Sequence, residues 1–512
     1  MRRALPGGAV PGGALPGGAL PGGAVTVRVS IGALAGVVGF LAFVEFTSGV
    51  LQGYYTPMLT NIARHLGIHD ADVNWLEGTQ LMLSALVVPA FAKFGDMIGH
   101  KRMLLISTAI TGAAAFVLPF TDSFAVFLIG WALMGFYVVW LPLEIALIWL
   151  RARRMQGRST ITARAAGLLV AALESGAIIG ALAGGALVDA LPLSVVLLVP
   201  AVMIVICFVV VLFGVRESPE PTGGVFDTTG LVLISLALIA FTGGLSLLRL
   251  NGPADPLSWL VVALGVALVV PFVLWELRQD DPLIDVRMFR SPALGPVFLT
   301  AGLFGVSVLG AQAPLSTFAR TDPAVYGYGL GTTGFATSLI IGVYLVAMIT
   351  GALLYPVASR LATPRISLIV AAVLVGIGFL LFLPLHSTYL QVIVNMVVVG
   401  LGSGALVAAL PAAAASAAAH TQTGVATGLT NSVKTVGGAI ASCVFGIALL
   451  NSVASTGAAA EGTAGSFAGY LTVWVVCGVT ALAAAALLLV VPKTAFSDTG
   501  SPAASPDEPA AD

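Results

Sequence analysis

Four ionisable side chains lie inside long apolar stretches of the sequence: Glu45, Glu144, Glu174 and Lys434. A charged side chain at the centre of a bilayer costs at least about 2.5–3.5 kcal/mol on insertion scales, so such residues are usually functional. Glu45 begins a polar stripe on one helical face, continued by Ser48, Gln52 and Tyr55. This stripe predicts a water-lined cavity in which Glu45 takes up and releases a proton. A permanently protonated structural Glu45 is the alternative.

The other buried charges allow similar roles. Glu174 and Lys434 fall at nearly the same depth in the membrane. If they met, they would neutralise each other, and protonation of Glu174 would release Lys434. A purely structural pair is an equal alternative. Glu144 follows Pro142, which can kink a helix, and is a candidate proton site at the inner gate. Glu77 begins the second apolar stretch and either acts at the cavity mouth or simply reaches water. The expected coupling ion is a proton, with no other cofactor.

The elements that position these groups are membrane helices. Apolar residues make up 58% of the chain and charged residues 9%, whereas soluble proteins have about 25% charged residues. A helix needs about 20 apolar residues to cross a bilayer, and turns, prolines and charges divide the chain into fourteen such segments. The spans are predicted at 30–56, 73–93, 102–120, 123–149, 163–188, 193–214, 228–248, 257–277, 293–318, 333–358, 366–384, 389–417, 424–451 and 467–491. The chain is thus predicted to be an all-α polytopic membrane protein.

The basic residues predict how these spans are oriented. With the N-terminus in the cytoplasm, most of the 22 Lys and Arg residues fall in cytoplasmic segments, as the positive-inside rule requires. Both termini are therefore expected inside, in the plasma membrane. Residues 1–29, with their Pro-Gly-Gly-Ala repeats, predict a disordered arm, and residues 492–512 predict a disordered tail. The scattered Cys and His residues predict neither a disulfide framework nor a metal site.

The turn between the second and third predicted spans carries a Gly-Asp pair followed by basic residues. Its key positions are Gly95, Asp96, Gly99, Lys101 and Arg102. The Asp96 carboxylate is expected to meet helix N-terminal N–H groups or the nearby basic side chains. The pattern resembles the loop between spans two and three of the major facilitator superfamily, although Ala92 and Met97 replace a Gly and an Arg of that motif. The resemblance implies a cytoplasmic gate.

The fifth predicted span strengthens this resemblance. Its glycines, Gly176, Gly180, Gly184 and Gly185, are similar to the antiporter motif of that family, with Ala181 where Pro is usual. Close helix packing is the simpler explanation for glycines four residues apart. The fourth span departs from the family, because Trp131 stands where an Arg is usual. The thirteenth span repeats part of the glycine pattern of the fifth, as two related halves would.

The number of spans resembles the fourteen-span drug/proton antiporter group. That likeness implies the major facilitator fold, with six-helix bundles at 30–214 and 293–491 and two inserted central helices at 228–277. Candidate residues for a substrate cavity are Gln52, Tyr55, Gln80, Trp131, Tyr137, Gln312, Tyr344, Asn395, Asn431 and Lys434. They predict an apolar cavity with a few polar groups.

The function expected from the sequence is proton-coupled export of hydrophobic or amphipathic small molecules, such as drugs or secondary metabolites, with antibiotic resistance as the outcome. Proton-coupled or facilitated uptake of a small metabolite is the alternative. No catalytic constellation appears, so an enzyme is not expected. The expected partners are the small-molecule substrate, protons and membrane lipid. The protein is expected to act as a monomer, without nucleic acid.

Overall fold

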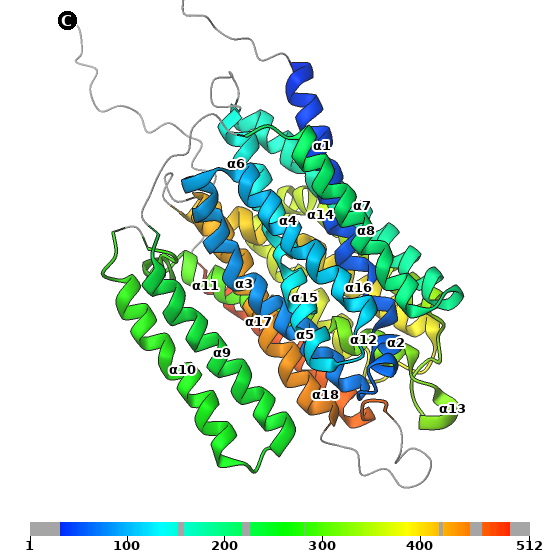
Figure 1. Ribbon diagram of the computed structural model, residues 1–512. Helices are drawn as coiled ribbons and strands as arrows, with labels where there is room; N and C mark the ends of the chain where they lie inside the picture. The colour runs from blue at the N-terminus through cyan, green and yellow to red at the C-terminus, as the bar shows by residue number, and fades with distance from the viewer. Residues whose placement is uncertain are drawn as a thin grey trace, which may run out of the picture.

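The computed structural model describes residues 31–151, 158–217, 226–280, 282–418, 423–450 and 463–491, and the described chain is built from helices (Figure 1). The first half holds α1 (Ile31–Tyr54), α2 (Leu59–His65), α3 (Val73–Ile98), α4 (His100–Val117), α5 (Phe124–Met134), α6 (Trp140–Arg151), α7 (Arg158–Ala190) and α8 (Leu193–Gly214). Next come α9 (Thr228–Asn251) and α10 (Pro256–Glu276). The last part holds α11 (Leu294–Val308), α12 (Gln312–Arg320), α13 (Pro323–Tyr326), α14 (Gly334–Leu361), α15 (Pro364–Leu380), α16 (Tyr389–Ala417), α17 (Thr423–Leu450) and α18 (Phe467–Leu488). The two predicted terminal tails lie outside the described residues.

Twelve helical segments in the described part of the chain are long and apolar enough to cross a membrane. Helix α15 is a shorter apolar helix, and α1 spans 24 residues. The protein is therefore a multi-pass membrane protein, while the count of fourteen spans stays a prediction.

Polar residues start many of these helices, because their side chains satisfy backbone N–H groups that have no partner within the helix. Asp227 accepts from the N–H of Gly230 at 2.8 Å, and Asp255 accepts from that of Ser258 at 3.0 Å. Thr388 forms a capping box with Gln391 at the start of α16. These caps fix the ends of α9, α10 and α16 close to the predicted positions.

Two spans are interrupted near their middle. Helices α5 and α6 form one span joined by a 3-10 segment, Gly135–Val139. The predicted kink at Pro142 lies elsewhere, because Pro142 falls in the first turn of α6, where its missing N–H leaves no hydrogen bond unmade. Helices α11 and α12 form another span, broken by a turn around Gly310. Interrupted helices of this kind let a substrate site form at membrane depth.

The buried apolar residues fall into two main clusters, one in α1–α8 and one in α11–α18. We call these two groups of helices the N half and the C half. Helix α3 packs on α17 and α7 packs on α14, and these two contacts join the halves. Helices α9 and α10 form a hairpin at the side of the bundle (Figure 1), with α9 against α3 and α17.

The two halves use the same kind of helix crossing. A Cβ added to Gly176 of α7 would lie 2.1 Å from the Phe46 carbonyl oxygen of α1. At Gly437 of α17, a Cβ would lie 2.2 Å from the Gly302 carbonyl oxygen of α11. The internal repeat seen in the sequence therefore corresponds to equivalent close crossings in the two halves.

Candidate functional site

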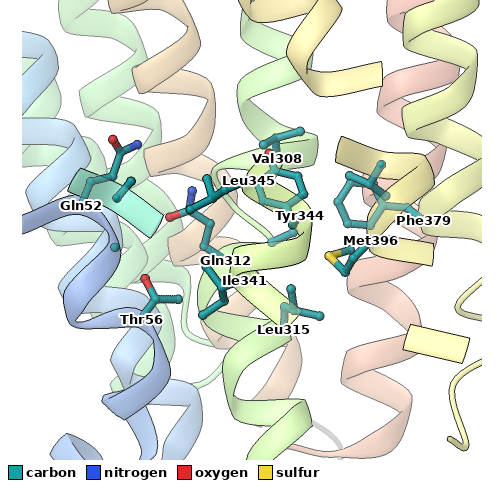
Figure 2. Close-up of a pocket in the computed structure, with 14 residues that line it drawn as sticks. Gln52, Thr56, Val308, Gln312, Leu315, Ile341, Tyr344, Leu345, Phe379 and Met396 are labelled. Carbon is teal, nitrogen blue, oxygen red and sulfur yellow. The ribbon is translucent and has the colours of Figure 1, made fainter. Parts of the chain in front are cut away.

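A cavity lies between the two halves (Figure 2). Its lining comes from seven helices and their connections: Gln52, Gly53, Thr56, Ala177, Val308, Ala311, Gln312, Leu315, Ile341, Tyr344, Leu345, Phe379, Met396 and Val399. Its volume is about 70 Å³. The lining is mostly apolar with a few polar groups, as small-molecule sites usually are. In this conformation the cavity is narrow, and a bulky ligand requires it to widen.

Three predicted cavity residues line this space: Gln52, Gln312 and Tyr344. Figure 2 shows Gln52 on one side, with Gln312 and Tyr344 facing it from the C half. Between them they offer two amides and one phenol, which can fix the orientation of an apolar ligand.

Other predicted cavity residues are buried within one half. Tyr55 and Trp131 stack edge to face with their ring centroids 5.0 Å apart, and they are 4% and 1% exposed. Asn395 is fully buried and donates to the Leu385 carbonyl at 2.7 Å. These three residues do not line the cavity. The polar stripe that starts at Glu45 meets the cavity only at Gln52, because Glu45, Ser48 and Tyr55 are buried.

The remaining cavity candidates lie elsewhere. Gln80 packs against Gly135, whose added Cβ would lie 2.8 Å from the Gln80 carbonyl oxygen. Tyr137 lies edge-on to Trp140. Asn431 and Lys434 are half-buried on α17. None of these four is part of the cavity wall.

Glu45 and Glu144 lie next to each other inside the N half. Both side chains are fully buried, and their carboxyl oxygens have no hydrogen-bond partner among the described residues. Neither has an ion-pair partner among these residues. Sequence analysis identified each glutamate separately but not their pairing, which joins α1 to α6.

Glu77 extends this set of acidic groups. It is half-buried on α3, and α3 packs on the 3-10 segment Gly135–Val139, which carries Tyr137. Ionisable residues in membrane spans often belong to proton relays, so Glu77 stays a candidate for such a role.

Glu174 of α7 and Lys434 of α17 lie in different halves, and both side chains are half-buried. Nitrogen and oxygen do not approach within 4 Å, so the structure holds no direct ion pair between these described residues. The sequence left open whether the two charges meet, and in this conformation they do not form an ion pair.

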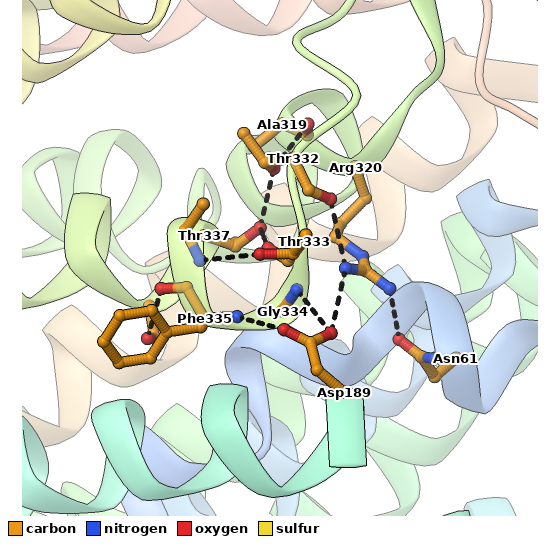
Figure 3. Close-up of polar contacts among 11 residues, drawn as sticks. Asn61, Asp189, Ala319, Arg320, Thr332, Thr333, Gly334, Phe335 and Thr337 are labelled. Atoms are coloured by element: carbon orange, nitrogen blue, oxygen red, sulfur yellow. Dashed lines mark hydrogen bonds and ion pairs between the residues drawn. The ribbon is translucent and has the colours of Figure 1, made fainter.

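A polar cluster joins the halves at one end of the bundle (Figure 3). Asp189, at the end of α7, accepts hydrogen bonds at 2.8 Å from the N–H groups of Gly334 and Phe335, which begin α14. Arg320 lies 3.8 Å from the Asp189 carboxylate and donates to Asn61 at 2.8 Å. A carboxylate at a helix N-terminus is favoured by the helix dipole. We call this cluster the latch, and this side of the bundle the Asp189 end.

Further contacts close the same end. Ser316 donates to the Thr56 carbonyl, and the Asp70 N–H donates to the Thr463 carbonyl at 2.8 Å. Thr56 also lines the cavity, so this contact layer lies directly beyond it. Several hydrogen bonds between the halves therefore lie at the Asp189 end. The cavity is therefore sealed on that side.

The latch was not found from the sequence. Sequence analysis assigned no role to Arg320 or Asp189. A single Asp at a helix end is a common cap, and no local pattern shows that it caps a helix of the other half.

Asp189→Asn should weaken the latch. The amide keeps some hydrogen bonding but loses the negative charge that interacts favourably with the α14 N-terminus and Arg320. This loss should destabilise the closed Asp189 end by about 1 kcal/mol, which raises the population of molecules open at this end about fivefold. Spin labels at Leu191 and Val325, exposed at this end, should then report long distances in a larger share of molecules. Because the native cysteines are buried, the spin labels should react only with cysteines introduced at these two positions.

The matched control is Asp322→Asn. Asp322 only caps the neighbouring helix α13, so its replacement should leave the distances unchanged. An equal shift in both variants would show that the latch does not hold this end closed.

The opposite end holds the predicted gate motif, and we call it the Gly99 end. Here Glu217 accepts from the N–H groups of Lys101 and Arg102 at 3.0 and 3.1 Å and so caps α4. Asp96 lies 3.4 Å from the ring nitrogen of His100, and its predicted contact with helix N–H groups or basic side chains stays a prediction. Gly99 has φ 110°, where only glycine is free of strain, and its Cα faces the Glu217 carboxylate closely. Gly95 packs against His100.

The antiporter-like glycines have two packing partners. Gly176, Gly180 and Gly184 face the backbone of α1, whereas Gly185 faces Gly334 and Ser338 of α14. Helix α7 thus contacts its own half and the other half at close range. The close-packing explanation is present in the structure, and an antiporter role stays a prediction.

Residues 41–442 match the family described as Major Facilitator Superfamily. The chain belongs to this superfamily. It is a transporter rather than an enzyme, and its helical architecture is the fold of that family.

Two curated relatives are named for export of antibiotics. Cephamycin export protein CmcT of Amycolatopsis lactamdurans is 27% identical over 457 residues, which covers 86% of this chain and 89% of that protein. The tetracenomycin C resistance and export protein of Streptomyces glaucescens is 24% identical and covers 75% and 70%. These two matches extend over most of each chain.

A third relative and two solved structures complete the comparison. The puromycin resistance protein pur8 of Streptomyces alboniger is 29% identical, over 41% of this chain and 40% of that protein. An auto-inhibited peptide transporter of the POT family superposes with a TM-score of 0.64 at 17% identity, covering 92% and 99%. Nucleoside transporter NupG gives 0.60 at 12%, covering 90% and 98%. At these identities, the structures show the shared fold alone.

Proposed function

We propose that this transporter exports hydrophobic or amphipathic small molecules in exchange for protons, by alternating access. The relatives named for antibiotic export support the direction and the kind of substrate. The mostly apolar cavity between the halves, with Gln52, Gln312 and Tyr344 on its wall, supports binding of such molecules. The observation that carries proton coupling is the buried pair of Glu45 and Glu144.

The glutamate pair is suited to hold a transferable proton. Two carboxylates side by side in an apolar interior cannot both be charged without a cation, because desolvation and mutual repulsion both favour the neutral form. The pair is therefore expected to carry at least one proton. Glu77, near the start of α3 at the Asp189 end, is a candidate for proton entry from that side.

The closed Asp189 end supports access to the cavity from the other side of the membrane. Following the positive-inside rule, the Gly99 end faces the cytoplasm and the Asp189 end faces outward, with both termini inside. The closed layer at the Asp189 end then corresponds to a state that receives substrate from the cytoplasm. Opening of the latch, with closure of the Gly99 end around Asp96 and Lys101, would complete the cycle.

A direct test uses purified protein in proteoliposomes. A cephamycin, puromycin and tetracenomycin C are the first compounds, because relatives are named for them. Transport of at least one amphipathic compound should require a pH gradient and stop when an ionophore collapses it. Cells expressing the protein should also accumulate less of that compound. Gradient-driven accumulation in cells would instead support uptake, and transport unaffected by the ionophore would contradict proton coupling.

A further inference from the structure

A second, larger cavity lies beside the hairpin of α9 and α10. Its volume is about 800 Å³, and its wall comes from α3, α9, α10, α17 and the segment between α10 and α11. Of the residues that line it, only Ser432 and Arg290 have polar side chains. A cavity of this size is large enough for a small molecule, and its apolar wall favours hydrocarbon over water.

The groove has the depth of one leaflet of a bilayer. On α17 its wall runs from Leu429 to Ile440, which is about 16 Å at a rise of about 1.5 Å per residue. One leaflet supplies about half of the roughly 30 Å hydrocarbon core. The groove begins at the Gly99 end, where Phe226, just before α9, stacks on Phe94 of α3. It therefore matches the length of lipid chains that enter from the leaflet at the Gly99 end.

A cation stands at the mouth of this groove. Arg290 ends the 3-10 segment Val286–Arg290, lines the groove and is exposed. It makes no hydrogen bond or ion pair with another described residue, whereas Arg287 of the same segment donates to the carbonyls of Leu277 and Gln279 at 2.8 and 3.1 Å. Basic groups beside grooves between membrane helices attract the headgroups of anionic lipids.

We infer that this groove binds one anionic phospholipid, with its acyl chains between α10 and α17 and its phosphate on Arg290. A wholly apolar molecule would leave Arg290 without a counter-charge, and a small soluble anion would leave the apolar wall uncovered. With the Gly99 end inside, as proposed, the lipid comes from the cytoplasmic leaflet. This site is separate from the cavity between the halves, so it does not depend on which compound is transported.

Binding of two matched lipids tests the inference. Native mass spectrometry of the purified full chain, titrated with palmitoyl-oleoyl phosphatidylglycerol or phosphatidylcholine, gives the affinity of the first bound lipid. The two lipids carry the same chains, but only phosphatidylglycerol has a net negative charge. It should bind about fivefold more tightly, because a cation at the membrane surface contributes about that factor toward an anionic lipid.

Variants at the mouth then locate the headgroup. Arg290→Gln should remove the preference for phosphatidylglycerol, and Arg290→Lys, which keeps the charge, should retain it. Arg360→Gln is the matched control, because Arg360 is an exposed cation in the last turn of α14 and does not line the groove. It should leave both affinities unchanged.

A variant inside the groove locates the acyl chains. Val436→Trp places a large side chain in the groove and should weaken both lipids about tenfold, because it takes the space that the chains need. Leu260→Trp is the control: Leu260 is 65% exposed on α10 and lies outside the groove. Size-exclusion chromatography checks that both tryptophan variants are folded.

The inference is overturned if the two lipids bind equally well to the unchanged protein, or if Arg290→Gln and Arg360→Gln have the same effect. If Val436→Trp is folded and binds both lipids normally, the chains lie elsewhere and the inference also fails. Loss of puromycin binding in Val436→Trp with normal lipid binding would show that the groove holds a transported compound instead.

Discussion

Glu45→Gln is expected to lower gradient-driven export by at least about tenfold, because a group that transfers protons in a rate-limiting step contributes at least that much. Glutamine has the shape of a protonated glutamate and can hydrogen bond to Glu144, so the fold and substrate binding should persist. Glu144→Gln should have a similar effect, since either change leaves one carboxyl where two shared a proton. The measurement is substrate-driven proton movement in proteoliposomes, alongside substrate binding in detergent.

The control for this prediction is Glu276→Gln. Glu276 is also buried, at 1% exposed, but it lies at the end of α10, away from the cavity. The Glu276→Gln variant should retain proton-coupled transport. Normal proton movement in both Glu45→Gln and Glu144→Gln would rule out the pair as the proton site, whereas loss in all three variants would indicate a general effect of changing buried acids.

Gly176→Leu is expected to remove most folded protein from the membrane. A Cβ at this position would lie 2.1 Å from the Phe46 carbonyl oxygen of α1, and backbone cannot move aside as a flexible side chain can. Overpacking at such a helix contact costs about 3 kcal/mol or more. Size-exclusion chromatography of a fluorescent fusion measures the folded fraction, and thermal stability follows from heating the same sample.

The same helix supplies the control and a graded series. Gly167 lies on α7 with no atom within 4 Å of an added Cβ, so Gly167→Leu should behave like wild type. Among alanine variants, Gly176→Ala and Gly184→Ala should be more destabilising than Gly180→Ala. The nearest backbone atoms are at 2.1 Å for the first two and 2.8 Å for the third. A uniform loss of stability across α7, Gly167 included, would contradict this account.

Much of the fold could be predicted because it depends on local sequence. Helix lengths follow from apolar runs, and helix starts follow from capping residues such as Asp227 and Thr388. The candidate acids were found because a charge at membrane depth is conspicuous. The close crossing at Gly176 was also visible as a spacing of glycines.

The site could be predicted only in part, because it depends on how helices cross. Residues on one helical face meet different neighbours along the helix: at Gln52, α1 faces the cavity, while Tyr55 packs on Trp131 within its own half. The same limit explains why Glu217 rather than Asp96 caps α4. Partners that are more than a hundred residues away leave no local signal.

The hairpin of α9 and α10 has a consequence for motion. At the Asp189 end, Arg249 pairs with Asp72 at 2.6 Å, and at the other end Phe226 stacks on Phe94 at 4.1 Å. Both anchors belong to the N half. Toward the C half, the hairpin borders a largely apolar groove shared with α17, whose wall includes Val433 and Val436. When the two halves move relative to each other, we expect the hairpin to move with the N half while α17 slides past it. The two added helices would then place no polar contacts in the way of this movement.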